Sequence, residues 1–186
     1  ASPSNWTTQS THLISWTALT DTNGIHHYEY QIDNSAWTSI GLNTSFTTPS
    51  QSEGVHLVFV RGVDTPGNLG TLANLSLNID NSNPNTLVLR EWHSGLNWTS
   101  HNSPFYSWEN PGDVGSGVTS YVGELNGIQI SLGSNQTYHP NLSSGTHAFK
   151  VLSQDALYHN STWSATKTVY IDLDAPLNLS ISSSTH

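Results

Sequence analysis

The stretch His56-Leu-Val-Phe-Val-Arg-Gly-Val63 decides the fold, because its side chains fall into two alternating sets. A period of two is typical of a β-strand that buries one face. The stretch His147-Ala-Phe-Lys-Val-Leu152 repeats the pattern further along the chain. Positions that are apolar in both copies are expected to face inward, namely Val58 and Val60 with Phe149 and Val151. Positions that carry a charge in one copy are expected to face outward, namely Phe59 and Arg61 with Lys150 and Leu152.

The repeat extends over most of the chain. Asn5-Trp-Thr7 recurs as Asn97-Trp-Thr99, and Ile79-Asp80 recurs as Ile171-Asp172. A period that drifts by one residue predicts two copies of one folding unit, with the changes confined to loops. Each copy is expected to end at a proline, Pro84 or Pro176, which cannot continue a strand ladder. We therefore predict one domain over residues 1–82 and a second over residues 83–174.

Short strands separated by turn residues indicate an all-β fold. The predicted strands are 12–16, 26–32, 37–40, 44–47 and 72–79 in the first copy, with 104–108, 120–125, 128–132, 137–139 and 165–171 in the second. Tight turns are expected at Asp33-Asn-Ser35 and at Asn126-Gly127, since Asn and Gly tolerate a positive φ. Strands at this spacing predict two tandem β-sandwiches of the immunoglobulin-like type, with Trp16 and Trp108 in their cores.

Residues 175–186 belong to neither copy. They contain the alternating apolar residues Leu177, Leu179 and Ile181, and they resemble the opening of the chain. We interpret them as the first strand of a third repeat, or as a strand donated to the next subunit by β-strand addition. Either interpretation joins copies of the chain, or adjacent repeats, head to tail.

The composition excludes several classes of function. Four basic residues and a formal charge of −9 do not provide the cationic surface that nucleic acid or an anionic membrane requires. The chain has no cysteine, and no apolar run is long enough to span a bilayer. No nucleophile elbow, phosphate-binding loop or metalloprotease motif occurs. We expect neither an enzyme nor a required cofactor.

Eight asparagines fit the N-glycosylation pattern Asn-x-Ser/Thr: Asn5, Asn43, Asn74, Asn97, Asn135, Asn141, Asn160 and Asn178. Several of these positions recur between the copies. One interpretation is a secreted glycoprotein, since glycans are attached to exposed asparagines of exported chains. The other is a surface rich in Ser, Thr and Asn that forms such triplets by chance.

Calcium is the candidate metal ion. Five aspartates are expected near strand ends or linkers, where oxygen ligands suit Ca²⁺: Asp64, Asp80, Asp155, Asp172 and Asp174. The alternative is that these aspartates cap turns by accepting backbone N–H bonds. Adjacent histidines His26 and His27 are expected to point to opposite faces of a strand, and therefore not to hold one metal ion together.

The chain also contains seven tryptophans and seven tyrosines. Those at repeated positions are expected in the cores. Trp37, Trp92 and Trp163 are less repeated and are candidates for a carbohydrate-binding platform.

Three sequence motifs of the chain resemble those of a known family. Tyr28-Glu-Tyr-Gln-Ile-Asp33, then Ser52-Glu-Gly-x-His56, then Val60-Arg-Gly-Val-Asp64-x-x-Gly-Asn68 is similar to the prokaryotic immunoglobulin-like (fibronectin III-like) repeats of secreted and cell-surface proteins. The likeness covers both copies, although the second keeps only Gly145-x-His147 and Asp155 of these motifs. The resemblance implies a β-sandwich used as a spacer, stalk, adhesin segment or filament subunit.

The sequence thus predicts a structural repeat unit of an extracellular, N-glycosylated filament or surface stalk. The alternative is an adhesin or a carbohydrate-binding module of a larger secreted protein.

Overall fold

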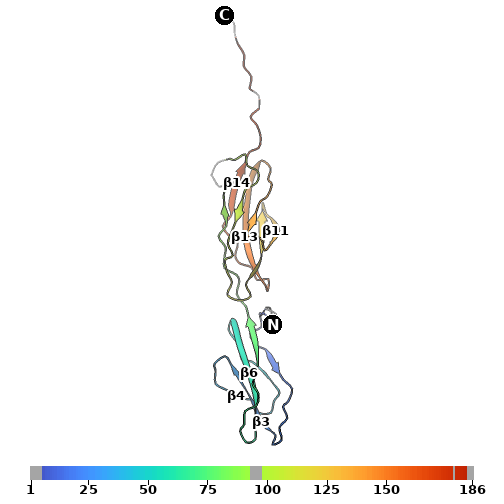
Figure 1. The fold of residues 1–186 in the computed structure, drawn as a ribbon. Helices are drawn as coiled ribbons and strands as arrows, with labels where there is room; N and C mark the ends of the chain where they lie inside the picture. Colours follow the sequence, from blue (N-terminus) through green and yellow to red (C-terminus); the bar gives the residue numbers. More distant parts are fainter. Residues whose placement is uncertain (1–5, 93–97, 178, 184–186) are drawn as a thin grey trace. The chain divides into compact units, whose positions relative to one another are not determined.

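The structure, a computed structural model, describes residues 6–92, 98–177 and 179–183. Every regular element in these ranges is a β-strand, which confirms the all-β fold class (Figure 1). No helix with the length and hydrophobicity of a membrane span occurs in them. The chain packs as two compact units. Unit 1 contains the described residues up to Pro84, together with Gly112–Val118 and Asp155–His159, and unit 2 contains the remainder.

Unit 1 contains two sheets. The strands are β1 (Trp6–Thr7), β2 (Leu13–Ser15), β3 (Ile25–Ile32), β4 (Thr38–Ser39), β5 (Ser45–Thr47), β6 (Gly54–Asp64) and β7 (Ala73–Ile79). The larger sheet has the order β1-β7-β6-β3-β4, and the smaller one pairs β2 with β5. All pairs are antiparallel except β1 with β7, which places Thr7 opposite Ile79.

Unit 2 repeats this arrangement. Its strands are β8 (Arg90–Glu91), β9 (Tyr106–Ser107), β10 (Val118–Leu125), β11 (Ile128–Gly133), β12 (Thr137–Tyr138), β13 (Gly145–Asp155) and β14 (Lys167–Ile171). One sheet has the order β11-β10-β13-β14 and the other β12-β9-β8. A parallel bridge joins Thr99 to Ile171, 92 positions after the Thr7–Ile79 pair.

The core of each unit lies between its two sheets. In unit 1 the buried cluster is Ile14, Ile32, Val58, Val60 and Leu77, with Trp16, Tyr30 and Phe46 packed against it. In unit 2 the fully buried Phe149 lies among aromatic rings, with ring centroids 4.5 Å from Tyr106 and 5.1 Å from Tyr138. Burial of apolar side chains between two sheets is what stabilises a sandwich of this size.

The strand alternation predicted from the sequence holds with one exception. Val58, Val60, Phe149 and Val151 are buried, as expected. Leu152 was expected to face outward but is buried too. On the same face of β13, the Trp163 ring centroid lies 4.7 Å from the Lys150 ammonium, so a large apolar side chain covers this side of the strand.

The two histidines at the start of β3 differ from the prediction. The pairing of β3 with β6 shifts register between Ile25 and His27, as at a β-bulge or a similar irregularity. A bulge re-aims side chains. As a result, Nδ1 of His26 lies 2.8 Å from Nδ1 of His27, so the expectation that these rings point to opposite faces is wrong.

The smaller sheets of the two units differ by one strand. Ile14 pairs with Phe46 in unit 1 as Tyr106 pairs with Tyr138 in unit 2. In unit 2, β8 adds to the other edge of β9, where Arg90 lies opposite Ser107. In the part of unit 1 that the structure describes, no strand takes the equivalent place beside β2.

Candidate functional site

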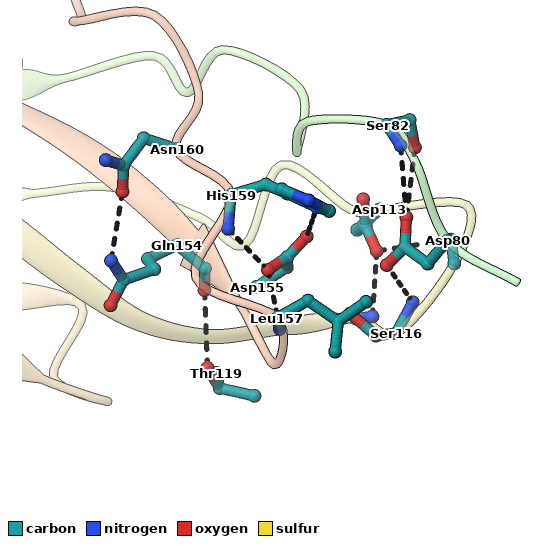
Figure 2. A network of polar contacts seen from close by, with 12 residues as sticks. Asp80, Ser82, Asp113, Ser116, Thr119, Gln154, Asp155, Leu157, His159 and Asn160 are labelled. Atoms are coloured by element: carbon teal, nitrogen blue, oxygen red, sulfur yellow. Dashed lines mark hydrogen bonds and ion pairs between the residues drawn. The ribbon is translucent and has the colours of Figure 1, made fainter. Parts of the chain in front are cut away.

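A cluster of buried polar side chains lies in unit 1, where three segments of the chain meet (Figure 2). Asp80 follows β7, Asp155 ends β13, and His159 follows the turn after β13. Asp80 is 0% exposed and Asp155 is 1% exposed. One ligand atom from each of Asp80, Asp155 and His159 lies within 4.8 Å of the other two. This cluster is the candidate metal centre among the described residues.

The local sequence explains how Asp155 and His159 come together. The Asp155 carboxylate accepts hydrogen bonds from the Leu157 and His159 backbone N–H groups at 2.8 Å, and its other oxygen lies 2.8 Å from Nδ1 of His159. In the first copy, Asp64 accepts from the backbone and side chain of Asn68 at 2.6 and 2.7 Å. Aspartates cap turns in this way. His159 therefore takes the place of Asn68 in a repeated turn.

Asp80 is held by two other segments. One of its oxygens accepts from the Ser82 N–H at 3.2 Å and the other from the Ser116 N–H at 2.7 Å. Burial alone would raise the pKa of the Asp80 carboxyl, but hydrogen bonds from Ser116 and Ser82, together with the charge of His159, hold that pKa below its usual value. Gly115 approaches so closely that a Cβ on it would lie 2.2 Å from the Asp80 carboxyl carbon.

Chemically, this arrangement is two buried carboxylates and one imidazole with their hydrogen-bonding capacity largely used. Both oxygens of Asp80 and of Asp155 already accept N–H bonds. The cluster therefore ties the 112–118 and 155–159 segments to the end of β7. Any metal ion here would have Asp80, Asp155 and His159 as its protein ligands.

The structure brings together two of the five aspartates that the sequence singled out. Asp64 caps its own turn, and Asp172 and Asp174 lie exposed after β14. His159 was not predicted as part of the site. The sequence feature that could have included it is the alignment of Asp155-x-x-x-His159 with Asp64-x-x-x-Asn68. That alignment indicates a repeated turn, however, and not a metal ligand.

The predicted assembly strand carries no strand assignment in the described residues after β14 (Figure 1). Leu177, Leu179 and Ile181 are 85%, 92% and 89% exposed. The 92-residue offset that aligns Pro84 with Pro176 also aligns Leu87 with Leu179 and Leu89 with Ile181. Leu87 and Leu89 are each 4% exposed in unit 2. The tail thus carries apolar residues at positions that unit 2 buries.

An apolar groove opens beside β2 in unit 1. It has a volume of about 280 Å³ and is lined by residues of β2, β6 and β7 and the segments beside them. The lining includes Ile14, Ser15, Trp16, Val60, Gly62, Thr71 and Ala73. Trp16 is only half-buried there, whereas its counterpart Trp108 is 4% exposed in unit 2. Among the described residues, Trp16 is therefore covered less completely than Trp108.

The glycosylation candidates in the described residues are all exposed: Asn43, Asn74, Asn135, Asn141 and Asn160. Asn5, Asn97 and Asn178 lie outside the described residues. Asn74 differs from the other four because it lines the groove beside β2. An attached glycan at Asn74 would occupy the rim of that groove.

The three tryptophans that were candidates for a carbohydrate platform do not share one surface of one unit. The guanidinium of Arg61 lies 3.9 Å from the ring centroid of Trp37, and the ammonium of Lys150 lies over the ring of Trp163. Such cation–π contacts occupy a ring face. Trp92 is exposed, but Trp37 belongs to unit 1, whereas Trp92 and Trp163 belong to unit 2.

Comparison with known proteins identifies no family. No protein-family model and no curated protein matches the chain. Among solved structures, the chain is similar to the fibronectin(III)-like modules of Clostridium thermocellum CbhA, with 11% sequence identity, 92% of each chain covered and a TM-score of 0.40.

Proposed function

We propose that this chain is a structural repeat unit of an extracellular, N-glycosylated filament or surface stalk, in which copies or adjacent repeats join head to tail. The proposal rests on the exposure of apolar residues in the C-terminal tail, residues 175–186. Leu179 and Ile181 are almost fully exposed, yet they occupy the repeat positions of Leu87 and Leu89, which are buried in unit 2. Exposed apolar residues that match buried residues of the other copy favour a partner that covers them.

The energetics support a joint of this kind. Burying a leucine or isoleucine side chain contributes about 1.5–3 kcal/mol, and an added strand also supplies backbone hydrogen bonds. A repeated heterologous contact that does not close produces a linear assembly. The function is mechanical, so it requires no catalytic residue.

The extracellular and glycosylated parts of the proposal rest on the asparagines. Peptide mapping of the native protein by mass spectrometry tests them. We expect glycans on Asn43, Asn135, Asn141 and Asn160, which are exposed and lie outside the groove lining. A native chain without any glycan would contradict this part of the proposal.

The joint is tested by removing the tail. Light scattering after size exclusion gives the mass of the 186-residue chain and of a chain ending at Asp174. We expect multiples of the chain mass for the first and a single chain for the second. Multiples that persist without residues 175–186 would show that another surface joins the copies.

The alternative, an adhesin or carbohydrate-binding module, gains no specific support from the tryptophans. Two of the three candidates have a cation against the ring.

A further inference from the structure

We infer that the solvent-facing side of the larger sheet of unit 1 is the contact surface for an N-glycan attached to Asn74, with the Phe59 ring packed against the first sugar. This inference rests on the glycosylated part of the proposed function. It goes further by assigning one glycan a contact on the protein and a role in covering apolar side chains.

The contact surface consists of three apolar side chains of β6, Val55, Leu57 and Phe59, which we call the outer row. Val58 and Val60 of the same strand are 1% and 9% exposed in the core, so the residues that alternate with them point to the other face of the sheet. Val55 and Leu57 are 57% and 44% exposed, and Phe59 is partly buried. A contiguous apolar row toward solvent favours a partner that covers it.

Asn74 lies beside this row because of the register between β6 and β7. Phe59 is opposite Asn74, and Leu57 is opposite Ser76. Side chains that are directly opposite in an antiparallel pair share a face, with Cβ atoms about 4.5–5.5 Å apart. Asn74 stands at the rim of the groove beside β2, and this pairing turns its exposed side chain toward the outer row. The asparagine and the serine of the glycosylation triplet are therefore on the face that carries the outer row.

A sugar suits this surface chemically. A pyranose ring has C–H groups on its faces and hydroxyl groups around its edge, so it can cover an aromatic ring while its hydroxyls stay in water. The first sugar is joined to the Asn74 side-chain nitrogen and therefore begins next to Phe59. Leu57 is two residues along the strand, about 7 Å from Phe59, and lies within reach of the second sugar.

The second copy provides a comparison, because the equivalent strands pair in unit 2. β13 pairs with β14 there as β6 pairs with β7 in unit 1, and Ala148 lies opposite Thr168. The corresponding pair in unit 1 is Leu57 with Ser76. By this alignment, Thr166-Lys-Thr168 takes the place of the triplet, and it contains no asparagine. Unit 2 therefore has no glycosylation triplet at this place.

The apolar row is missing from unit 2 as well. The residues at the three places of the outer row are Thr146, Ala148 and Lys150. The Lys150 ammonium, at the place of Phe59, lies 3.0 Å from the Glu124 carboxylate, so a charged pair occupies this position. The exposed apolar row thus occurs in the copy that has a triplet beside it, and not in the copy that lacks one.

The first measurement is peptide mapping of the native protein, which shows whether Asn74 carries a glycan. We expect Asn74 to be modified. An unmodified Asn74 in a chain that carries glycans on other asparagines would overturn this inference and leave the glycoprotein proposal standing. A native chain with no glycan would overturn both.

The second measurement tests the contact. The chain is produced in a host that N-glycosylates exported proteins, as wild type and as Phe59→Thr, which removes the ring and keeps a residue suited to a strand. NMR with isotope-labelled sugars records the C–H signals of the sugar on Asn74, identified by their absence from Ser76→Ala. We expect the Phe59 ring to shift these signals upfield in the wild type, and we expect the shift to be lost in Phe59→Thr. The sugar on Asn135, in unit 2, is the matched control and should give the same signals in both chains.

The third measurement tests the cover through stability. Ser76→Ala prevents attachment while retaining Asn74, and the same variant compared with the wild type in unglycosylated form gives the effect of the substitution itself. We expect the glycan to raise the melting temperature by about 2–6 °C when Phe59 is present and by less than about 1 °C in Phe59→Thr. A modified Asn74 whose sugar signals and gain in melting temperature are the same with and without the ring would overturn the inference, because the glycan would then extend into solvent.

Discussion

At the scale of single residues, buried carboxylates in this molecule are stabilised by the N–H groups that surround them. Asp80 and Asp155 are almost completely buried. Asp155 accepts backbone hydrogen bonds from Leu157 and His159 in its own turn, and Asp80 accepts them from Ser82 and from Ser116 on another segment. A buried carboxylate without such donors would be strongly destabilising. The close approach of Gly115 to Asp80 follows from this arrangement, because the Ser116 N–H must reach the carboxylate.

Gly115→Ala is therefore expected to destabilise unit 1. The added methyl group would collide with the Asp80 carboxylate, and overpacking of this kind costs about 1–3 kcal/mol. Chemical denaturation followed by circular dichroism measures the loss. The matched control is Val114→Ala in the same loop, where the side chain is exposed and the change should stay within about 0.5 kcal/mol. Equal effects of the two variants would show that the contact with Asp80 is unimportant.

The two copies also offer a matched pair of histidines for a test of pH dependence. Nδ1 of His56 lies 2.8 Å from Asp33, and the hydrogen bond raises the pKa of His56 and lowers that of Asp33. Nδ1 of His147 lies 2.9 Å from the neutral amide of Asn126. The contribution of the protonated His56 to the free energy of unfolding is complete below its unfolded pKa of about 6.5, and it is lost as pH rises through the raised pKa of the folded state. The Asp33 contribution is present above about 3.9 and is lost as pH falls through the lowered pKa.

We accordingly expect His56→Gln to lower the free energy of unfolding more at about pH 5.5 than at about pH 9. At about pH 5.5, between the ordinary pKa values of aspartate and histidine, His56 is protonated and Asp33 is ionised, so the pair contributes fully. The effect should remain below about 1 kcal/mol, because the pair is near the surface. His147→Gln should show a smaller difference between the two pH values. Denaturant titrations at both pH values measure the two variants. An effect of His56→Gln that does not change with pH would mean that the pair contributes through packing alone.

The calcium hypothesis, restricted to Asp80 and Asp155, makes its own prediction. Calcium at millimolar concentration would raise the melting temperature of the wild-type chain relative to a sample in EDTA, because a ligand that binds only the folded state stabilises it. Asp80→Asn would abolish the difference, whereas Asp64→Asn would not, since Asp64 lies outside the cluster. Identical melting temperatures with calcium and EDTA would leave the cluster as a hydrogen-bonded turn cap.

At the scale of elements, the long strands could be predicted from their alternation, whereas the two-residue strands β1 and β8 were not predicted. β6 and β13 carry the pattern within their own residues. β1 and β8 are two residues each, and they depend on pairing with β7 and β9, which are distant in the sequence. The same limit applies to the polar cluster. Each aspartate could be singled out as a turn or linker residue, but the meeting of Asp80 with Asp155 depends on tertiary packing.

At the scale of the whole molecule, the repeat places apolar residues in the C-terminal tail that match residues buried in unit 2. Leu179 and Ile181 match Leu87 and Leu89, which are each 4% exposed. A contact between the tail of one copy and a different surface of the next would be heterologous, and such a contact adds copies in a line unless it closes into a ring.

The most direct test of this account is electron microscopy of the wild-type chain beside two matched tail variants. We predict linear assemblies for the wild type and for Leu177→Asp, because Leu177 matches the exposed Asn85. We predict dispersed single particles for Leu179→Asp/Ile181→Asp, which places charges at the positions that match the buried Leu87 and Leu89. Dispersed wild-type particles, or linear assemblies that survive the double substitution, would contradict the account.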